Sequence, residues 1–275
     1  YTNGNVYDGN WVNDKREGYG RMSCEGELYE GNFVSNKRSG NGKLTLFNVF
    51  VYEGNFVNDL KSGTGKCTYC NGDAYEGEYH DDKRNGKGIM SYANGDVYDG
   101  EWLNDKYNGK GLFKSNEKDL YEGDFANGKR EGYGVCRYSN GDEYSGQWND
   151  NILHGEGCYT SLNGKTYKGS YVKGKREGKG IMTFSDGEIY EGNWYNSKYN
   201  GDGKFTNSDK EIYEGGFVDG KKQGYGIYYL KNGDKYEGQW LKGKYHGQGR
   251  YLYANKDIYE GNYVNGLYNG YGVYI

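Results

Sequence analysis

The sequence lacks proline, long apolar runs and an excess of charge of either sign, and each absence narrows what the chain can be. Its 39 acidic and 35 basic residues give a formal net charge of −4, which offers no general attraction to phosphates and argues against a DNA or RNA binder. No apolar run approaches the roughly 20 residues that a membrane-spanning helix needs. The first residues do not resemble a signal peptide, and Tyr1 is expected to lie inside a longer protein.

Groupings of residues that perform catalysis are also lacking. We find no Ser-His-Asp arrangement, no pair of acids and no phosphate-binding loop in the sequence. The spacing Gly-x-Gly occurs, but it recurs at regular intervals and never opens a predicted helix, so it is not a nucleotide-binding fingerprint. The expectation is a protein that is not an enzyme and holds no cofactor.

Glycine and tyrosine are what the chain has in abundance, with 50 and 34 copies in 275 residues. Glycine usage is far above the usual level of about 7%. Together with the mean hydropathy of −1.11, this would fit a disordered chain, but disordered segments are poor in aromatics and this chain is 17% aromatic. The chain is therefore predicted to be ordered, with few aliphatic core residues.

A Tyr followed two residues later by Gly recurs along the whole chain, first after 22 residues and then every 23. The twelve tyrosines are Tyr7, Tyr29, Tyr52, Tyr75, Tyr98, Tyr121, Tyr144, Tyr167, Tyr190, Tyr213, Tyr236 and Tyr259. Counted from each Tyr as position 0, Gly stands at +2, +11 and +13 in all twelve repeats. The chain is thus a repeat array throughout.

Each repeat reads as two short strands. Position +4 is always aromatic, so positions 0, +2 and +4 share one face of a strand, and mostly polar residues at +1 and +3 share the other. Turn-forming residues follow at +6 and +7, as in Asn104-Asp105, and the second strand ends in Asn-Gly or Asp-Gly in six repeats. We expect the glycines to supply flat backbone beneath the rings, and the aromatic face to be built by stacking of successive repeats.

The pattern Tyr190-Glu191-Gly192-x-Trp194, followed by Gly201-x-Gly203, resembles the MORN (membrane occupation and recognition nexus) repeat, and the resemblance covers all twelve repeats. It implies an all-β fold: an elongated, twisted, single-layer antiparallel β-meander with one hairpin per 23-residue repeat, forming a rod-like solenoid. At about 4.8 Å per strand, 24 strands would span on the order of 115 Å. Residues 1–275 are expected to form a single array that is incomplete at both ends, because Tyr1 to Asn5 look like the end of a preceding repeat and Ile275 stops the last one early.

The resemblance also implies a function. Some MORN arrays are appended to enzymes such as phosphoinositide kinases or lysine methyltransferases, whereas others make up nearly the whole protein, as in protist cytoskeletal scaffolds. With twelve repeats and no other domain visible, the prediction is a non-catalytic scaffold in the cytoplasm, associated with the cytoskeleton and lying next to membranes. The alternatives are a phosphoinositide-binding module and the targeting region of a larger enzyme.

A second period of about 46 residues runs from the fourth repeat onward. Position +4 is Trp in odd repeats and Tyr or Phe in even ones. Positions +8 and +9 are Lys-Tyr in three of the odd repeats and a basic pair in four of the even ones. One interpretation is that large and smaller rings alternate so that neighbours fit; the other is duplication of a two-repeat block. The two are compatible.

The aromatic face of the odd repeats is the predicted site for a protein partner, with a groove that would hold an apolar or helical segment of a cytoskeletal or other scaffold protein. The predicted groove residues are Tyr98, Trp102, Tyr144, Trp148, Tyr190, Trp194, Tyr236 and Trp240.

The basic pairs of the even repeats are the predicted contacts for acidic phospholipids or another acidic ligand. They are Lys83, Arg84, Lys129, Arg130, Lys175, Arg176, Lys221 and Lys222. Against lipid binding stand the net charge and the acidic residue at +1 in ten of the twelve repeats. Solvated turn residues that keep a long, ring-rich sheet soluble are the alternative interpretation.

The cysteines give weak signals. Their odd number of five and irregular spacing indicate a reduced, intracellular compartment. Cys67-x-x-Cys70 lacks the second half of a zinc site, and Cys24, Cys67 and Cys136 fit positions of small buried hydrophobic residues. A metal or disulfide clip between two chains through His154 and Cys158 is a minor alternative.

Self-association is the last prediction, because an open sheet leaves unpaired strand edges and terminal repeats are normally atypical caps. The final repeat still carries the standard aromatic residues. A two-fold homodimer is therefore expected through the C-terminal repeats. The residues predicted to form its interface are Tyr259, Tyr263, Tyr268, Tyr271 and Tyr274.

Overall fold

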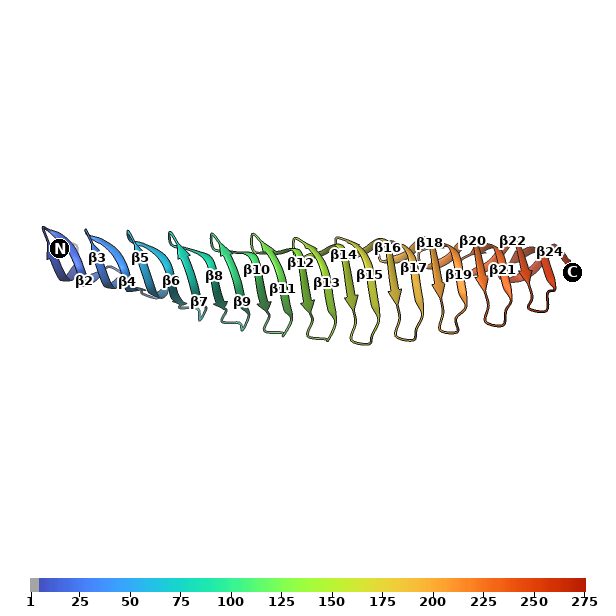
Figure 1. Cartoon of the computed structure of the whole chain (residues 1–275), viewed down its shortest axis with the longest axis horizontal. Coiled ribbons are helices and arrows are strands. Elements are labelled where there is room, and N and C mark those ends of the chain that lie inside the picture. The colour runs from blue at the N-terminus through green and yellow to red at the C-terminus, as the bar shows by residue number, and fades with distance from the viewer. Residues whose placement is uncertain (1–4) are drawn as a thin grey trace. The chain divides into compact units, whose positions relative to one another are not determined.

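The computed structural model describes residues 5–275 and contains 24 β-strands and no helix in that range. Accordingly, no helix long and apolar enough to cross a membrane occurs among these residues. The strands follow one another in chain order as antiparallel hairpins (Figure 1). The predicted all-β antiparallel meander with one hairpin per repeat is confirmed. Of the predicted tail of a preceding repeat, only Asn5 lies within the described residues.

The chain divides into two units, Tyr1–Ser139 and Asn140–Ile275. The first unit contains β1 (Val6–Val12), β2 (Lys15–Cys24), β3 (Glu27–Val34), β4 (Lys37–Leu46), β5 (Phe50–Val57), β6 (Leu60–Tyr69), β7 (Ala74–His80), β8 (Lys83–Ser91), β9 (Val97–Leu103), β10 (Lys106–Lys114), β11 (Leu120–Ala126) and β12 (Lys129–Arg137). The second contains β13 (Glu143–Asn149), β14 (Ile152–Thr160), β15 (Thr166–Val172), β16 (Lys175–Thr183), β17 (Ile189–Tyr195), β18 (Lys198–Thr206), β19 (Ile212–Val218), β20 (Lys221–Tyr229), β21 (Lys235–Leu241), β22 (Lys244–Leu252), β23 (Ile258–Val264) and β24 (Leu267–Tyr274).

A two-residue turn at positions +6 and +7 joins the strands within each repeat. Asn104 and Asp105, between β9 and β10, have φ angles of 49° and 66°. Positive φ at both central residues defines the type I′ turn, whose twist matches that of the flanking strands and which favours Asn, Asp and Gly. The predicted turns are confirmed, and the positive φ angles that they require explain why Asn and Asp occur there.

A longer connection joins one repeat to the next, and it contains the Asn-Gly pair. Between β8 and β9, the Gly95 amide donates to the Tyr92 carbonyl over 2.9 Å, and Gly95 takes a φ of 93°. Asp96 then accepts from the backbone amide of Asn116 in the next connection, with an N–O distance of 2.8 Å. In the same way the backbone amide of Ala93 donates to Asp73, so carboxylates link successive connections.

Each hairpin is bulged at the glycine of position +11. In the hairpin of β9 and β10, Gly100 pairs with Gly111 and Trp102 pairs with Tyr107, so three residues of β10 face one residue of β9 between these pairs. Gly109, in the middle of the bulge, has a φ of 64°, which a residue with a side chain adopts only with strain. A bulge bends the strand pair, and here the side chain at +9 lies against the ring at position 0.

The tyrosine at position 0 lies over the glycine pair at +2 and +13. Tyr98 is fully buried, and a Cβ added to either Gly100 or Gly111 would come within 2.6 Å of its side chain. Its hydroxyl donates to the Glu101 carbonyl over 2.8 Å. The same arrangement recurs at Tyr29 and at the other buried tyrosines of this position. The prediction that glycine supplies flat backbone beneath the rings is confirmed.

We predict that Gly111→Ala lowers the unfolding free energy by about 3 kcal/mol, as expected when a methyl group enters a fully packed site. The new Cβ would displace the Tyr98 ring and break its hydroxyl bond to Glu101. Urea unfolding followed by tryptophan fluorescence measures the effect. Gly128→Asn is the matched control: Gly128 has a φ of 85° with open space around it, and Asn fits this turn position elsewhere in the chain. Equal unfolding midpoints for the two variants would contradict the prediction.

Candidate interaction surfaces

The buried rings form a ladder of edge-to-face contacts. Tyr98 meets Trp102 of its own repeat at a centroid distance of 5.3 Å and Phe125 of the next repeat at 5.2 Å, both nearly perpendicular. Tyr190 repeats the pattern with Trp194 and Phe217 in the second unit. Edge-to-face pairs add about 0.5–1.5 kcal/mol beyond the burial of their area. Each repeat is therefore held by its neighbour through the same two contacts.

All eight residues of the predicted partner groove belong to this ladder and are buried. Their exposed fractions do not exceed 5%, with Trp240 the most exposed. The indole nitrogens of Trp102, Trp194 and Trp240 donate to the carbonyls of glycines at position +13 over 3.0–3.2 Å. These rings are the core of the protein. Their contact with a partner stays a prediction, and such a contact would require displacement of the side chains that cover the rings.

The side chain at position +9 covers the tyrosine of its own repeat. In the fifth, ninth, eleventh and twelfth repeats this side chain is a second tyrosine, stacked nearly parallel. The ring centres of Tyr107 and Tyr98 lie 3.7 Å apart, as do those of Tyr199 and Tyr190. In most of the other repeats it is a cation, as in Arg130, whose guanidinium lies 4.8 Å from the centre of the Tyr121 ring. The aromatic face is closed in both cases.

The 46-residue period has a structural counterpart, because the side chain at +9 also contacts the ring at +4 of the next repeat. The cations Arg84 and Arg176 lie 4.4 and 4.6 Å from the rings of Trp102 and Trp194. Tyr107 instead meets the smaller Phe125 at 5.8 Å. Trp is the best ring partner for a cation. In these repeats a cation is thus paired with Trp and a tyrosine with a smaller ring, whereas in the first repeats a cation meets a smaller ring, as Arg16 meets Phe33. Both interpretations of the 46-residue period remain compatible with these contacts.

The structure separates the two members of each predicted basic pair. Arg84 at +9 is held on the aromatic face, where its Nε lies 3.0 Å from Asp105 Oδ1 and its side chain is only 19% exposed. Arg176 and Lys222 are likewise half-buried. The first members are exposed at the start of their strands; they are Lys83, Lys129, Lys175 and Lys221. Contact of these residues with an acidic ligand stays a prediction.

Lys222 differs from the arginines at the same position. Its Nζ lies 3.9 Å from the ring centre of Tyr228, 4.7 Å from that of Tyr213 and 4.8 Å from that of Trp240. The rings attract the cation, but loss of water around it costs more, since burial lowers the pKa of Lys222 to about 8. Glu211 opposes this shift only in part.

The cysteines and histidines do not come together. Cys67 and Cys136 are fully buried, as predicted for small hydrophobic residues, whereas Cys24 is half-buried and Cys70 is exposed. No disulfide and no group of three or more His, Cys, Asp or Glu side chains suited to a metal ion occurs within residues 5–275. The clip through His154 and Cys158 between two chains stays a prediction.

The five tyrosines predicted for dimerisation fall into two groups. Tyr259 and Tyr263 are buried members of the ladder. Tyr268, Tyr271 and Tyr274 lie on β24, which is exposed at every residue, and Tyr271 is 83% exposed. Only the second group is available to a second chain.

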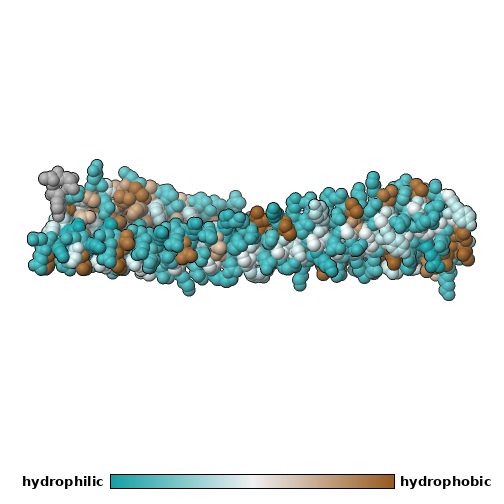
Figure 2. All heavy atoms as spheres, turned by 90° about the horizontal axis from the view of Figure 1, so that it is seen from above, coloured by the Kyte–Doolittle hydropathy of each residue, from teal (hydrophilic) through white to brown (hydrophobic). Residues whose placement is uncertain are grey.

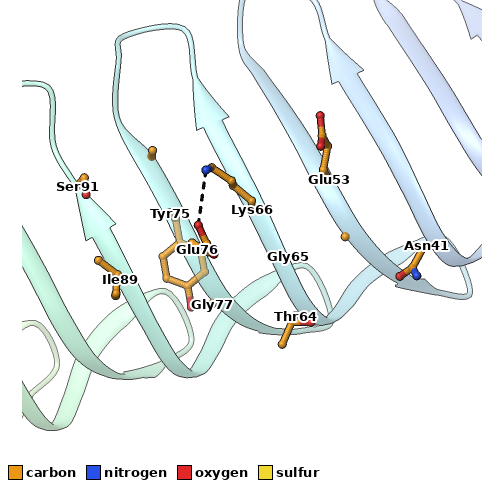
Figure 3. Close-up of a pocket in the computed structure, with 12 residues that line it drawn as sticks. Asn41, Glu53, Thr64, Gly65, Lys66, Tyr75, Glu76, Gly77, Ile89 and Ser91 are labelled. Atoms are coloured by element: carbon orange, nitrogen blue, oxygen red, sulfur yellow. Dashed lines mark ion pairs between the residues drawn. The ribbon is translucent and has the colours of Figure 1, made fainter.

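The face opposite the rings carries the side chains at +1, +3, +12 and +14, and we call it the charged face. Across β4 to β7 its acids and bases alternate from strand to strand: Lys43 lies 2.7 Å from Glu53, and Lys66 lies 3.6 Å from Glu76. Figure 3 shows this second ion pair beside Ile89, which replaces a base on the following strand, β8. Figure 2 shows a surface on which hydrophilic residues predominate and hydrophobic ones form small groups.

From the sequence, only the acids at +1 of this face were considered, and position +14 was not singled out. It carries a base in the first three repeats and then Ile89, Leu112 and Val135 in the next three. Each of these apolar residues lies directly beside an acid at +1 of a neighbouring strand, as Leu112 does beside Asp99 and Glu122. These apolar residues can be found in the sequence by comparing one position across all repeats, rather than the residues within one repeat.

Comparison with known proteins gives one family. The MORN repeat model matches twelve consecutive segments, residues 7–26, 29–48, 52–74, 75–97, 98–118, 121–143, 144–166, 167–189, 190–211, 213–235, 236–258 and 259–275. No enzyme family was found. No curated protein is similar enough in sequence to match the chain.

The solved structures that match the chain are remote from it in sequence. The TCP10 domain of Danio rerio CPAP, in complex with a peptide of Danio rerio STIL, is 10% identical with a TM-score of 0.44, over 73% of this chain and 90% of that one. The TCP domain of SAS-4 (dCPAP) of Drosophila melanogaster, in complex with a proline-rich motif of Ana2 (dSTIL), is 17% identical with a TM-score of 0.35, over 57% of this chain and 85% of that one.

We predict that Lys222 makes stability depend on pH between about 8 and 10.5. The folded-state pKa, about 8, lies below the ordinary value of 10.5. In this window the unfolded chain still binds the proton that the folded chain has released, so stability rises with pH. Relative to Lys222→Met, the wild type should gain up to about 1 kcal/mol per pH unit in urea unfolding. The comparison removes the contribution of the tyrosines, and parallel curves for the two proteins would show that Lys222 keeps its ordinary pKa.

Proposed function

Because the chain belongs to the MORN repeat family, we propose that it is a non-catalytic scaffold that binds other proteins and associates with the cytoskeleton. One observation supports the proposal: the aromatic rings are buried in contacts between neighbouring repeats, and these contacts stabilise the sheet. The charged face is left exposed over many successive strands. A surface that changes from repeat to repeat on a constant frame is suited to recognition of extended partners.

The scaffold is further proposed to be a homodimer that forms through β24. The support is the exposure of apolar side chains along this strand, where Leu267 is 73% and Tyr271 is 83% exposed. Exposed strands with apolar side chains pair readily with another strand. A second copy offers the same strand, so a two-fold contact between the two copies of β24 satisfies both.

Sedimentation velocity at micromolar concentration tests the dimer. The wild type is expected to sediment as a dimer and the Leu267→Lys, Tyr271→Lys variant as a monomer, because two buried charges would face their symmetry mates. Tyr19→Lys is the matched control, since Tyr19 occupies the same position of the first repeat and is 64% exposed. A monomeric wild type, or a control variant that also dissociates, would overturn the proposal.

A phosphoinositide-binding module is the second candidate, and the exposed lysines at +8 favour it. Each stands at the tip of a hairpin, directly after a type I′ turn, as Lys83 does after Asp81 and Asp82. A row of such tips would place ammonium groups at a lipid surface, where each is worth about 1 kcal/mol. The negative net charge of the chain opposes this reading.

Co-sedimentation with vesicles of phosphatidylcholine, with and without phosphatidylinositol bisphosphate, separates the two functions. We expect the chain to stay in the supernatant in both cases at physiological salt. Strong binding to the phosphoinositide vesicles that disappears when Lys83, Lys129, Lys175 and Lys221 become Glu would replace the scaffold by the lipid module. Arg84→Lys serves as control, because this residue is held on Trp102 and Asp105 and its change should leave vesicle binding unaltered.

A further inference from the structure

The charged face is not balanced along the chain. In β7 to β12 the positions +1, +3, +12 and +14 carry six carboxylates and two lysines. These are Glu76, Glu78, Asp99, Glu101, Glu122, Asp124, Lys87 and Lys110. The same positions of β1 to β6 carry three acids and three bases: Asp8, Glu30, Glu53, Arg21, Lys43 and Lys66. Lys114 of β10 and Arg137 of β12 add two bases to this face at position +16. The region of β7 to β12 therefore carries an excess of acids, beside a region in which acids and bases balance.

The change arises at position +14, where apolar residues replace bases. Following the pairing of the strands, Glu76, Ile89, Asp99, Leu112, Glu122 and Val135 lie side by side, one from each strand of β7 to β12. We call these six residues the acidic stripe. Ile89 and Leu112 are 44% and 37% exposed, and Asp99 and Glu122 form no ion pair within the described residues. Glu76 keeps its partner Lys66 at the margin of the stripe.

The stripe borders a hollow of about 710 Å³. Asp99, Leu112, Glu122 and Val135 line it, together with Tyr133, which is 55% exposed. Glu101 and the two lysines Lys87 and Lys110 complete its lining. Its floor is the glycine backbone at Gly100 and Gly111 and their neighbour Gly123. Apolar side chains between uncompensated carboxylates, over a floor without side chains, present a surface complementary to an apolar and basic partner.

The spacing of the stripe selects the form of that partner. Neighbouring strands lie about 4.8 Å apart, so apolar residues recur along the stripe about every 10 Å, with an acid midway. A helix advances about 10.5 Å in seven residues, so one apolar residue per heptad with a base three or four residues later follows the same rhythm. An extended chain presents a side chain on one face about every 6.7 Å, a spacing that does not match the roughly 10 Å repeat of the stripe.

We propose that the acidic stripe binds an amphipathic helix of a partner protein, with an apolar residue at every seventh position and Lys or Arg between. The inference rests on the proposed scaffold function and names the face and the class of partner that it uses. The apolar residues of the helix lie against Ile89, Leu112 and Val135, and its basic residues pair with Asp99 and Glu122. The closed aromatic face takes no part in the contact.

A synthetic peptide of three heptads, with Leu at every seventh position and Lys three and four residues later, tests the proposal by fluorescence anisotropy. The peptide should bind the wild type, more weakly as salt is added. The Ile89→Lys, Leu112→Lys variant restores the pattern of Lys43 and Lys66, so that each acid gains a base within the chain. It should keep the urea midpoint of the wild type and bind the peptide roughly tenfold more weakly or worse.

Ile227→Lys is the matched control, because it makes the same change at position +14 in the second unit and should leave binding unaltered. Equal affinity for the wild type and the double variant overturns the proposal, as does equal binding of a peptide with Glu in place of Lys. A peptide broken by prolines that binds as tightly overturns the helical form. If the peptide does not bind while the vesicle and sedimentation experiments give the expected results, the proposed binding surface is refuted. The proposed scaffold function is not contradicted by that outcome.

Discussion

Everything in this structure depends on one contact, the tyrosine ring at position 0 lying flat over two glycines that face each other across a hairpin. The contact needs both glycines, since a Cβ on Gly100 or Gly111 would reach within 2.6 Å of Tyr98. It also fixes the ring, because the hydroxyl donates to the carbonyl at +3. Glycine ordinarily weakens a strand, and burial of a large ring in the space that it leaves offsets that cost.

The placement of this ring determines the rest of the aromatic face. Its two edges meet the rings at +4 of its own and of the next repeat, and its open side is covered by the side chain at +9. That side chain in turn lies on the next ring at +4, where a cation meets Trp and a tyrosine meets Phe or Tyr. Stability therefore depends on neighbours rather than on a central core, as in other repeat proteins. Because the rings contact one another, the aromatic face is closed, and the opposite face remains exposed.

The opposite face is free to vary for the same reason. Positions +1 and +14 lie beside each other across the strands, and Lys66 beside Glu76 and Ile89 beside Glu76 both occur in the sheet. Replacing the base by an apolar residue removes an exposed ion pair, which costs little stability. Among the residues that the structure describes, it leaves Asp99 and Glu122 without an ion pair. The frame is constant and the charge pattern is local, which is how one repeat type can present different surfaces along a chain.

The sequence by itself determined the repeat, the strands, the turns and the face on which the rings lie, because all four depend on contacts within about one repeat. Tyr-x-Gly, the period of two and residues such as Asn104-Asp105 act locally and recur twelve times. Only the tertiary structure decided which of these residues are accessible. Tyr98 and Trp102, predicted to line a groove, are buried in the ring ladder. Arg84, predicted to lie with Lys83 at a hairpin tip, instead lies over the ring of Trp102. The physical reason is the bulge at +11, which brings +9 over position 0 and joins it to the next repeat, a contact that no spacing within one strand reveals.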